Sequence, residues 1–493
     1  MEELRNPIIL TCITLYMLLC LGIGIWALRK TKSAHDFFMA GKELGIWVTA
    51  FAVFSTTLSG FGFVGGPGLV YSMGMSSFWM AIIAVLGFSL SFMLLGKRLR
   101  LFAELGDFFS LPDVVYKRYG NNETRLLIAL AIILGVLGYL ATQVLAMSIV
   151  LKDILNAGGY FGDMSLEMCL IISCSILVFY SVTGGIIASV YTDMIQGGVM
   201  IIAALLVFIT VVYSFDGGLM EMNEIIYKDD PQAIGPWGTL GMFGCLSWML
   251  LFGLGGSGQP HVITKMMMNK KISDAKHILP VSILGYLFSA LLWIGIGLAM
   301  RALVINGAHP PLESPDQAAS QFLQYYAHPI LAGIVFAGLF AAIMSTADAF
   351  LNIGTAAVMH DIPKYFGKKI KNELLTARIT TFLLTVVASV FALYSGDLIA
   401  ILGAFGWGTF AAAIVPVVTI GFNWKRATAK AANIAILSSL VINFTFKMLK
   451  WTLPYNIDVG AFALIVSMIL FIVVTLMSKP PKLDPAVEKV MDM

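Results

Sequence analysis

Long runs of apolar residues, separated by short polar breaks, restrict the fold of this chain more than any other feature of its sequence. A membrane-spanning helix needs about 20 mostly apolar residues, and the chain contains thirteen such runs. The longest breaks have only about 25 residues, which leaves no room for a soluble domain. We therefore predict an all-α, multi-pass integral membrane protein with about 13 transmembrane helices. The predicted spans are residues 7–28, 46–71, 75–96, 126–151, 166–183, 187–214, 237–264, 278–304, 328–358, 377–394, 398–421, 431–448 and 457–477.

The distribution of Lys and Arg predicts how the chain is oriented. An odd number of spans places the two ends on opposite sides of the membrane. With the N-terminus outside, 25 of the 31 basic residues fall in inner segments and none lies deep in a span. Cytoplasmic loops are enriched in Lys and Arg, so we expect an outside N-terminus and a cytoplasmic C-terminus in the plasma (cell inner) membrane. The first run follows acidic residues and has no small-residue cleavage site, so we expect a retained helix rather than a signal peptide.

Two predicted spans contain clusters of glycine with a proline, at 60–68 in the second span and at 253–260 in the seventh. Proline removes a helical hydrogen bond, and exposed backbone polar groups are tolerated at membrane depth only around a polar cavity. The clusters lie five spans apart, which is typical of transporters built from five-helix inverted repeats with a site at the bilayer midplane. The alternative is that these glycines only allow close helix packing.

Oxygen-bearing side chains precede the first of these breaks and recur in the ninth span. A hard cation such as Na⁺ prefers about five oxygen ligands, which hydroxyls and freed carbonyls supply. Alternatively, the hydroxyls bond back to their own helices. The residues are Ser55, Thr56, Thr57 and Ser59, followed by Ser345, Thr346 and Asp348.

Asp193 and Asp348 are the two carboxylates that lie well within predicted spans. An unpaired charge there costs on the order of 2.5 to 3.5 kcal/mol. We predict that no Lys or Arg lies deep enough to neutralise either acid, so that a cation or a proton is the partner. The alternatives are that both acids stay protonated, or that Asp193 reaches the membrane interface.

Other function classes find no support in the sequence. Only 12% of the residues are charged, against about 25% in soluble proteins, and a net charge of +3 does not indicate nucleic acid binding. The sequence contains no HExxH, GxSxG or P-loop pattern. We expect that the chain is not an enzyme and that it has neither catalytic residues nor an organic cofactor. We interpret His261 as a structural residue.

Six motifs in order resemble the sodium:solute symporter family, nearest in pattern to its sodium/proline symporter branch. They are DFFMAGKELG at 36–45, GGPG at 65–68, VTGG at 182–185, YTDMIQG at 191–197, GQPH at 258–261 and MSTAD at 344–348. The resemblance implies a LeuT-type 5+5 inverted-repeat core within a single transporter domain, 1–493, that imports a solute with Na⁺ by alternating access. The repeats would be 46–214 and 237–421, with one extra N-terminal helix, 7–28, and two C-terminal helices, 431–477.

The resemblance also implies site residues. The family's Na⁺ site corresponds to the carbonyls of Ser55, Leu58 and Ala342 and the hydroxyls of Ser345 and Thr346. Some members bind a further Na⁺ beside the acid that corresponds to Asp193, and the hydroxyl positions of that site are Asp348 and Ala349 here. We therefore expect a second cation or proton site at Asp193, Ser345 and Asp348.

The resemblance restricts the solute less closely. The proline branch has a tryptophan and a tyrosine where this chain has Phe252 and Gly256, which predicts a larger or different solute. Sialic-acid members have an arginine where Gln143 stands, and residues 63–68 also resemble the pantothenate transporter. We predict a small, carboxylate-bearing solute: an amino acid such as proline, a monocarboxylate or a pantothenate-like acid. The candidate residues are Thr57, Ser59, Gly60, Gln143, Phe252, Gly256, Gln259 and Trp407.

Two alternatives remain open from the sequence. One is a proton-coupled symporter that uses Asp193 and Asp348. The other is a transporter-like sensor without net transport. We expect the lipid bilayer and the solute as partners, and a monomer as the functional unit.

Overall fold

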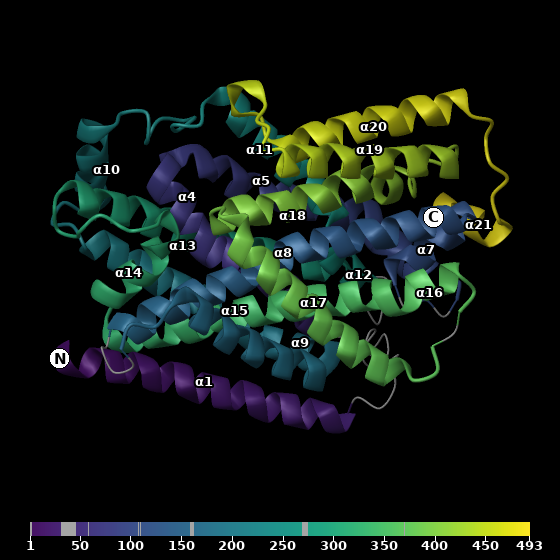
Figure 1. Ribbon diagram of the computed structural model, residues 1–493. Helices are drawn as coiled ribbons and strands as arrows, with labels where there is room; N and C mark the ends of the chain where they lie inside the picture. Colours follow the sequence, from purple (N-terminus) through teal and green to yellow (C-terminus); the bar gives the residue numbers. More distant parts are fainter. Residues whose placement is uncertain are drawn as a thin grey trace.

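The computed structural model describes residues 2–30, 46–57, 59–106, 108, 110–157, 162–268, 275–368 and 370–493, and these form helices and connecting turns without a strand (Figure 1). The helices are α1 (Glu2–Lys30), α3 (Ile46–Thr57), α4 (Gly66–Met73), α5 (Phe78–Ser91), α6 (Lys97–Phe102), α7 (Leu111–Tyr119), α8 (Asn122–Ala157), α9 (Leu166–Tyr213), α10 (Gly218–Asp229), α11 (Met242–Gly255), α12 (Pro260–Met267), α13 (Ala275–Ile305), α14 (Ala318–Tyr325), α15 (Pro329–Ala356), α16 (Ile362–Tyr365), α17 (Glu373–Ser395), α18 (Ile399–Ile414), α19 (Ala429–Met448), α20 (Val459–Met477) and α21 (Pro485–Asp492). Short π-helical segments, η2 (Phe61–Gly65), η4 (Phe92–Gly96), η8 (Ala357–Asp361) and η9 (Val415–Ile420), and 3-10 turns, η3 (Gly74–Ser77), η5 (Gly256–Gly258), η7 (Pro315–Gln317) and η10 (Pro454–Asn456), join them.

Ten helical stretches in the described part of the chain are long and apolar enough to cross a membrane. The all-helical membrane class is thus confirmed, whereas the count of thirteen spans is not. The difference lies in three predicted spans, of which 46–71 and 237–264 are divided by breaks. The third, 166–183, contributes only a short apolar stretch, Leu166–Phe179.

The predicted spans 166–183 and 187–214 lie in one element, because helical structure continues from Leu166 to Tyr213 in α9. A straight helix of this length would measure about 72 Å, more than twice the roughly 30 Å of a bilayer core. The two parts of α9 pack against different neighbours. Cys174 contacts Ser389 of α17, whereas Gln196 donates a hydrogen bond to Tyr16 of α1.

The bundle has a buried centre and more exposed outer helices. The percentages of residues that are buried within an 18-residue apolar segment differ between the helices. They are 89%, 78% and 72% in the spans Ile399–Ile420, Pro329–Tyr365 and Asn122–Ala157, against 17% in α1. In Figure 1, α1 runs along one edge, and α19 and α20 lie together at the opposite edge, beside α18. The central helices α8, α15 and α18 therefore place their side chains in the protein interior.

Both predicted helix breaks are confirmed. The helix α3 ends at Thr57, Ser59 forms a bend, and π-helical η2 leads into α4. The second break follows α11, where η5 and extended Gln259, with ψ of 109°, precede α12. Pro260 stands at the start of α12, where a missing N–H costs no helical hydrogen bond. The rings of Phe61 and Phe252, beside the two breaks, stack with centroids 5.9 Å apart.

Candidate functional site

The predicted Na⁺ ligands lie on two helices that pack together, α3 and α15. Ser55 and Ala342 are fully buried, and Ser345 and Thr346 are at most 1% exposed. The hydroxyls of Ser55 and Ser345 make no hydrogen bond to their own helices, so back-bonding does not account for them. Leu58 falls outside the described residues. Buried oxygens that are not used by their helix are available to a cation.

The central acids have a basic neighbour, contrary to our expectation. Lys265 is 2% exposed, and its Nζ lies 3.4 Å from Oδ2 of Asp193. The prediction that no basic side chain reaches the buried acids was therefore wrong. Lys265 directly follows the run 237–264 and counts as a loop residue by sequence. The break at 256–259 shortens that run, and α12 continues to Met267 inside the protein.

Asp193 is fully buried and Asp348 is 3% exposed, so the alternative in which Asp193 reaches the interface is also wrong. Ser345 lies beside the Asp193 carboxylate, and Asp348 lies near Lys265. The structure thus brings the predicted members of the second site, Asp193, Ser345 and Asp348, into one neighbourhood. It adds Lys265 to them.

The backbone after the first break is held by a side chain of α8. The amide of Gly60 donates to Oε1 of Gln143 at 2.8 Å. The amide of Phe61 donates to Oγ of Ser59 at 3.1 Å, and this Oγ lies 3.3 Å from Oη of Tyr139. The predicted solute residues Ser59, Gly60 and Gln143 therefore meet, and the Gly60 amide is occupied by Gln143. The side chain of Thr57 falls outside the described residues.

Aromatic side chains form the wall between the second break and α18. Phe252 stacks on Trp407 with centroids 5.0 Å apart. Gln259 Nε2 donates to the carbonyls of Gly255 and Trp407, at 3.0 and 3.3 Å. Within the described part of the chain, Gln259 Oε1, Trp407 Nε1 and both ring nitrogens of His261 are buried without a hydrogen-bond partner. Aromatic surface with a few convergent polar atoms is typical of a small-molecule site.

Gly256 does not widen this wall, contrary to the expectation from its small size. A Cβ at Gly256 would lie 2.7 Å from backbone atoms of Gly87 in α5. The glycine is needed because two backbones approach closely there, and α5 fills the space.

Two central residues were missed or set aside at the sequence level. Tyr139 stands one helical turn before Gln143, and this i, i+4 spacing was the available signal. His261 lies in the same aromatic group, with ring centroids 4.6 Å from Phe350 and 6.3 Å from Tyr139. Its position directly after the helix break was the corresponding signal.

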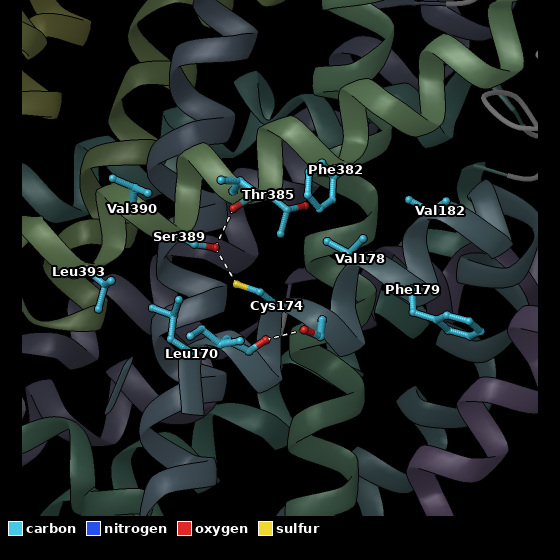
Figure 2. A pocket seen from close by; sticks show the side chains of 13 residues that line it. Leu170, Cys174, Val178, Phe179, Val182, Phe382, Thr385, Ser389, Val390 and Leu393 are labelled. Carbon is cyan, nitrogen blue, oxygen red and sulfur yellow. Dashed lines mark hydrogen bonds between the residues drawn. The ribbon is translucent and has the colours of Figure 1, made fainter. Parts of the chain in front are cut away.

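A groove of about 660 Å³ lies between α9 and α17, and Figure 2 shows the side chains that line it. Its lining is almost entirely apolar and runs from Leu170 to Val182 and from Phe382 to Leu393. Several of these side chains lie on the outside of the bundle, since Phe179 is 41% and Val390 50% exposed. An apolar, outward-facing groove is suited to hydrocarbon rather than to an ion or a carboxylate.

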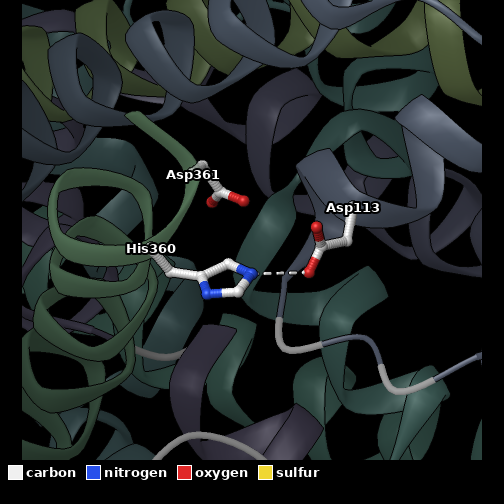
Figure 3. Close-up of side chains that lie close together, drawn as sticks. All are labelled: Asp113, His360 and Asp361. Atoms are coloured by element: carbon white, nitrogen blue, oxygen red, sulfur yellow. Dashed lines mark hydrogen bonds and ion pairs between the residues drawn. The ribbon is translucent and has the colours of Figure 1, made fainter. Parts of the chain in front are cut away.

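A second polar cluster, formed by Asp113, His360 and Asp361, lies where α7 meets η8 (Figure 3). The carboxylate oxygens and the imidazole nitrogen that could bind a metal ion lie within 4.8 Å of one another. Asp113 contacts His360 Nε2 at 2.9 Å, Lys364 Nζ at 3.0 Å and Arg125 at 3.4 Å. Burial alone would raise the pKa of Asp113, but His360 and Lys364 outweigh it and lower this pKa to about 2. The cationic neighbours balance the Asp113 carboxylate, and Ser110 Oγ donates to Oδ1 of Asp361, the second carboxylate of the cluster, at 2.6 Å. The geometry therefore favours a structural polar network over a metal site.

Two broken helices that meet in a membrane bundle, beside buried hydroxyls and carboxylates, define a secondary transporter. The comparison with known proteins is more specific. The chain belongs to the sodium:solute symporter family, whose profile matches residues 37–439. The resemblance seen in the motifs is confirmed, and so is the expectation that the protein is a transporter rather than an enzyme.

Similar proteins include an osmoregulated proline transporter, OpuE, of Bacillus subtilis, which is 28% identical over 96% of this chain and 95% of its own length. A sodium/proline symporter of Haemophilus influenzae is 28% identical over 97% and 96%. Among solved structures, a Na⁺-coupled sialic acid symporter superposes with a TM-score of 0.76 at 20% identity, covering 97% of this chain and 99% of that one. MhsT in complex with L-phenylalanine gives 0.55 at 14% identity, over 87% and 97%. These likenesses show the LeuT-type fold.

Proposed function

We propose that this protein imports a small carboxylate-bearing solute together with Na⁺ by alternating access, and that proline is the leading candidate solute. The observation that carries this proposal is the buried oxygen-rich face of α15, which packs against α3 next to the first helix break. The names of the proline-transporting relatives support the choice of solute.

In this proposal Na⁺ binds between α3 and α15, at the carbonyls of Ser55, Leu58 and Ala342 and the hydroxyls of Ser345 and Thr346. The ion draws the two helices together and fixes the broken segment that follows α3. The membrane potential favours inward movement of each charge by about 2.3 kcal/mol per 100 mV. Release on the inside follows when the gap between the helices opens.

The solute would lie between the two breaks. One side is Ser59, Gly60 and Gln143, and the other is Phe252, Gln259 and Trp407. The partner-free polar atoms of Gln259 and Trp407 would bind the polar groups of the solute, while the stacked rings of Phe252 and Trp407 contact its apolar part. A carboxylate that uses the Gly60 amide must displace Gln143 from it.

The proposal includes the organisation of the chain. Residues 46–214 and 237–421 would be the inverted repeats of a monomeric functional unit in the plasma membrane. The N-terminus would lie outside and the C-terminus in the cytoplasm.

Uptake of labelled proline into proteoliposomes tests the proposal. With an imposed negative inside potential, we expect uptake under an inward Na⁺ gradient and none when choline replaces Na⁺. Monocarboxylates and pantothenate, added as competitors, establish the solute class. Uptake driven by a pH gradient in Na⁺-free buffer would establish the proton-coupled alternative, and Na⁺-dependent binding without uptake would establish the sensor.

A further inference from the structure

A cavity of about 340 Å³ lies where the end of α7 meets the start of α19 and the segment that follows α20. In Figure 1, α7 and α21 lie at the end of the bundle where the C-terminus is marked. The volume is in the range of small-ligand sites. The charged side chains that line the cavity are Lys117, Arg118, Lys482 and Asp484. Lys117 Nζ and Asp484 Oδ2 form an ion pair at 2.6 Å. The lining therefore has an excess of positive charge, which comes from Arg118 and Lys482.

The guanidinium of Arg118 is held in place by the backbone. Arg118 is 3% exposed; its Nε donates to the Gly421 carbonyl at 3.1 Å, and its Nη2 donates to the carbonyls of Trp424 and Lys425 at 3.0 and 3.4 Å. The guanidinium carbon also lies 4.9 Å from the centroid of the Tyr119 ring. Within the described part of the chain, Nη1 is buried without a hydrogen-bond partner. None of these contacts is a carboxylate, and a buried charge is costly unless it is paired. An anion in the cavity would supply the missing countercharge.

The start of α19 favours an anion at the same place. Ala429 is the first residue of α19 and lines the cavity, and the amides at a helix N-terminus favour negative charge. With 20 residues, α19 is about 30 Å long, which is the thickness of the hydrocarbon core of a bilayer. Ala429 therefore lies at the level of the lipid headgroups. Lys482 is exposed and follows the end of the apolar helix α20 by five residues, where basic side chains attract anionic lipids.

We propose that this cavity binds a phosphate group, either the headgroup of an anionic phospholipid or free phosphate. Arg118 and Lys482 balance the charge of the phosphate, and the first turn of α19 adds its amide dipoles. Arginine suits this role because its planar, permanently charged guanidinium matches the geometry of phosphate oxygens. The site uses none of the residues of the proposed Na⁺ and solute sites, so the inference stands independently of the proposed function.

Native mass spectrometry of the purified full chain in detergent tests the lipid as the source, with phosphatidylglycerol or phosphatidylcholine added. If a lipid headgroup is bound, anionic phosphatidylglycerol should bind more tightly than zwitterionic phosphatidylcholine. Lys482→Gln should then weaken phosphatidylglycerol binding about five-fold, and Arg118→Gln should weaken it further. Lys489→Gln is the matched control, because Lys489 is also exposed and follows Lys482 closely but does not line the cavity. It should bind the lipid as the wild type does.

Thermal unfolding tests free phosphate as the source, with sodium phosphate replacing NaCl at constant Na⁺ concentration. Phosphate also stabilises proteins non-specifically, so the result is the difference between Lys482→Gln and Lys489→Gln. If free phosphate is bound, it should stabilise Lys482→Gln less than Lys489→Gln, and the two lipids should bind equally. The inference would be overturned if neither phosphatidylglycerol nor phosphate distinguished these two variants. Should Arg118→Gln not fold, the comparison of the two lysine variants still decides.

Discussion

Removing the Ser345 hydroxyl should weaken Na⁺ binding and leave the fold intact. Ser345 is 1% exposed on α15, and its Oγ makes no hydrogen bond to its own helix. Ser345→Ala therefore leaves no backbone carbonyl without its partner, and we expect little change in the free energy of unfolding when Na⁺ is absent. A hydrogen bond or ligand contact to a charged group is worth about 1.5 to 3 kcal/mol. At about 1.4 kcal/mol per tenfold change, the Na⁺ concentration for half-maximal uptake should rise by roughly 10- to 150-fold.

The measurement is a Na⁺ titration of solute uptake in proteoliposomes, with the membrane potential held constant. Ser148→Ala is the matched control, because Ser148 is also fully buried but donates to the Val144 carbonyl of its own helix at 2.6 Å. The control should keep the Na⁺ dependence of the wild type. The ligand assignment would be refuted if Ser345→Ala kept that dependence, or if both variants shifted it equally.

Three further predictions concern the scaffold. Burial raises the pKa of Asp316, which lies outside the spans, to about 7, so the buried carboxyl is favoured in its neutral form and the local fold should weaken as pH rises through 7. The protection factors of the amides in its loop, each taken relative to the intrinsic exchange rate at the same pH, should be lower at pH 8 than at pH 6, and Asp316→Asn should remove the difference. Gly66→Ala places a Cβ 2.3 Å from the Trp293 ring and should lower stability in thermal unfolding by about 1 to 3 kcal/mol, whereas Gly22→Ala, with no atom within 4 Å, should not. The pKa of Asp113 is lowered from 3.8 to about 2, so its charge should contribute about 2 kcal/mol to the free energy of unfolding above pH 4. This contribution should be lost as pH falls from 4 through 2. In denaturation at pH 7, Asp113→Asn should show the same loss.

Much of the fold could be predicted because membrane insertion depends on local sequence. A span is a contiguous run of apolar residues, and a break is a contiguous cluster of glycine and proline, so both are visible without tertiary information. The predicted breaks coincide with the ends of α3 and α11. The family motifs were equally local, which is why the sodium:solute symporter family could be recognised from short segments.

Helix continuity was less predictable. Two predicted spans lie within α9, because Gly184 and Gly185 do not end the helical structure there. A glycine pair weakens a helix without forbidding it, and packing decides the outcome. Gly256 illustrates the same limit, since its small size reflects the close approach of α5 rather than an open pocket.

The sequence by itself determined that this chain spans a membrane, where its helices break, and which oxygens and carboxylates lie inside. Those properties follow from the polarity and order of neighbouring residues. Only the tertiary structure decided how the buried charges are paired. Lys265 follows an apolar run and resembles a loop residue, yet the break before α12 turns it inward to Asp193, 72 positions away. Charge pairing in a low-dielectric interior depends on distances between helices, and these are fixed by packing rather than by sequence order.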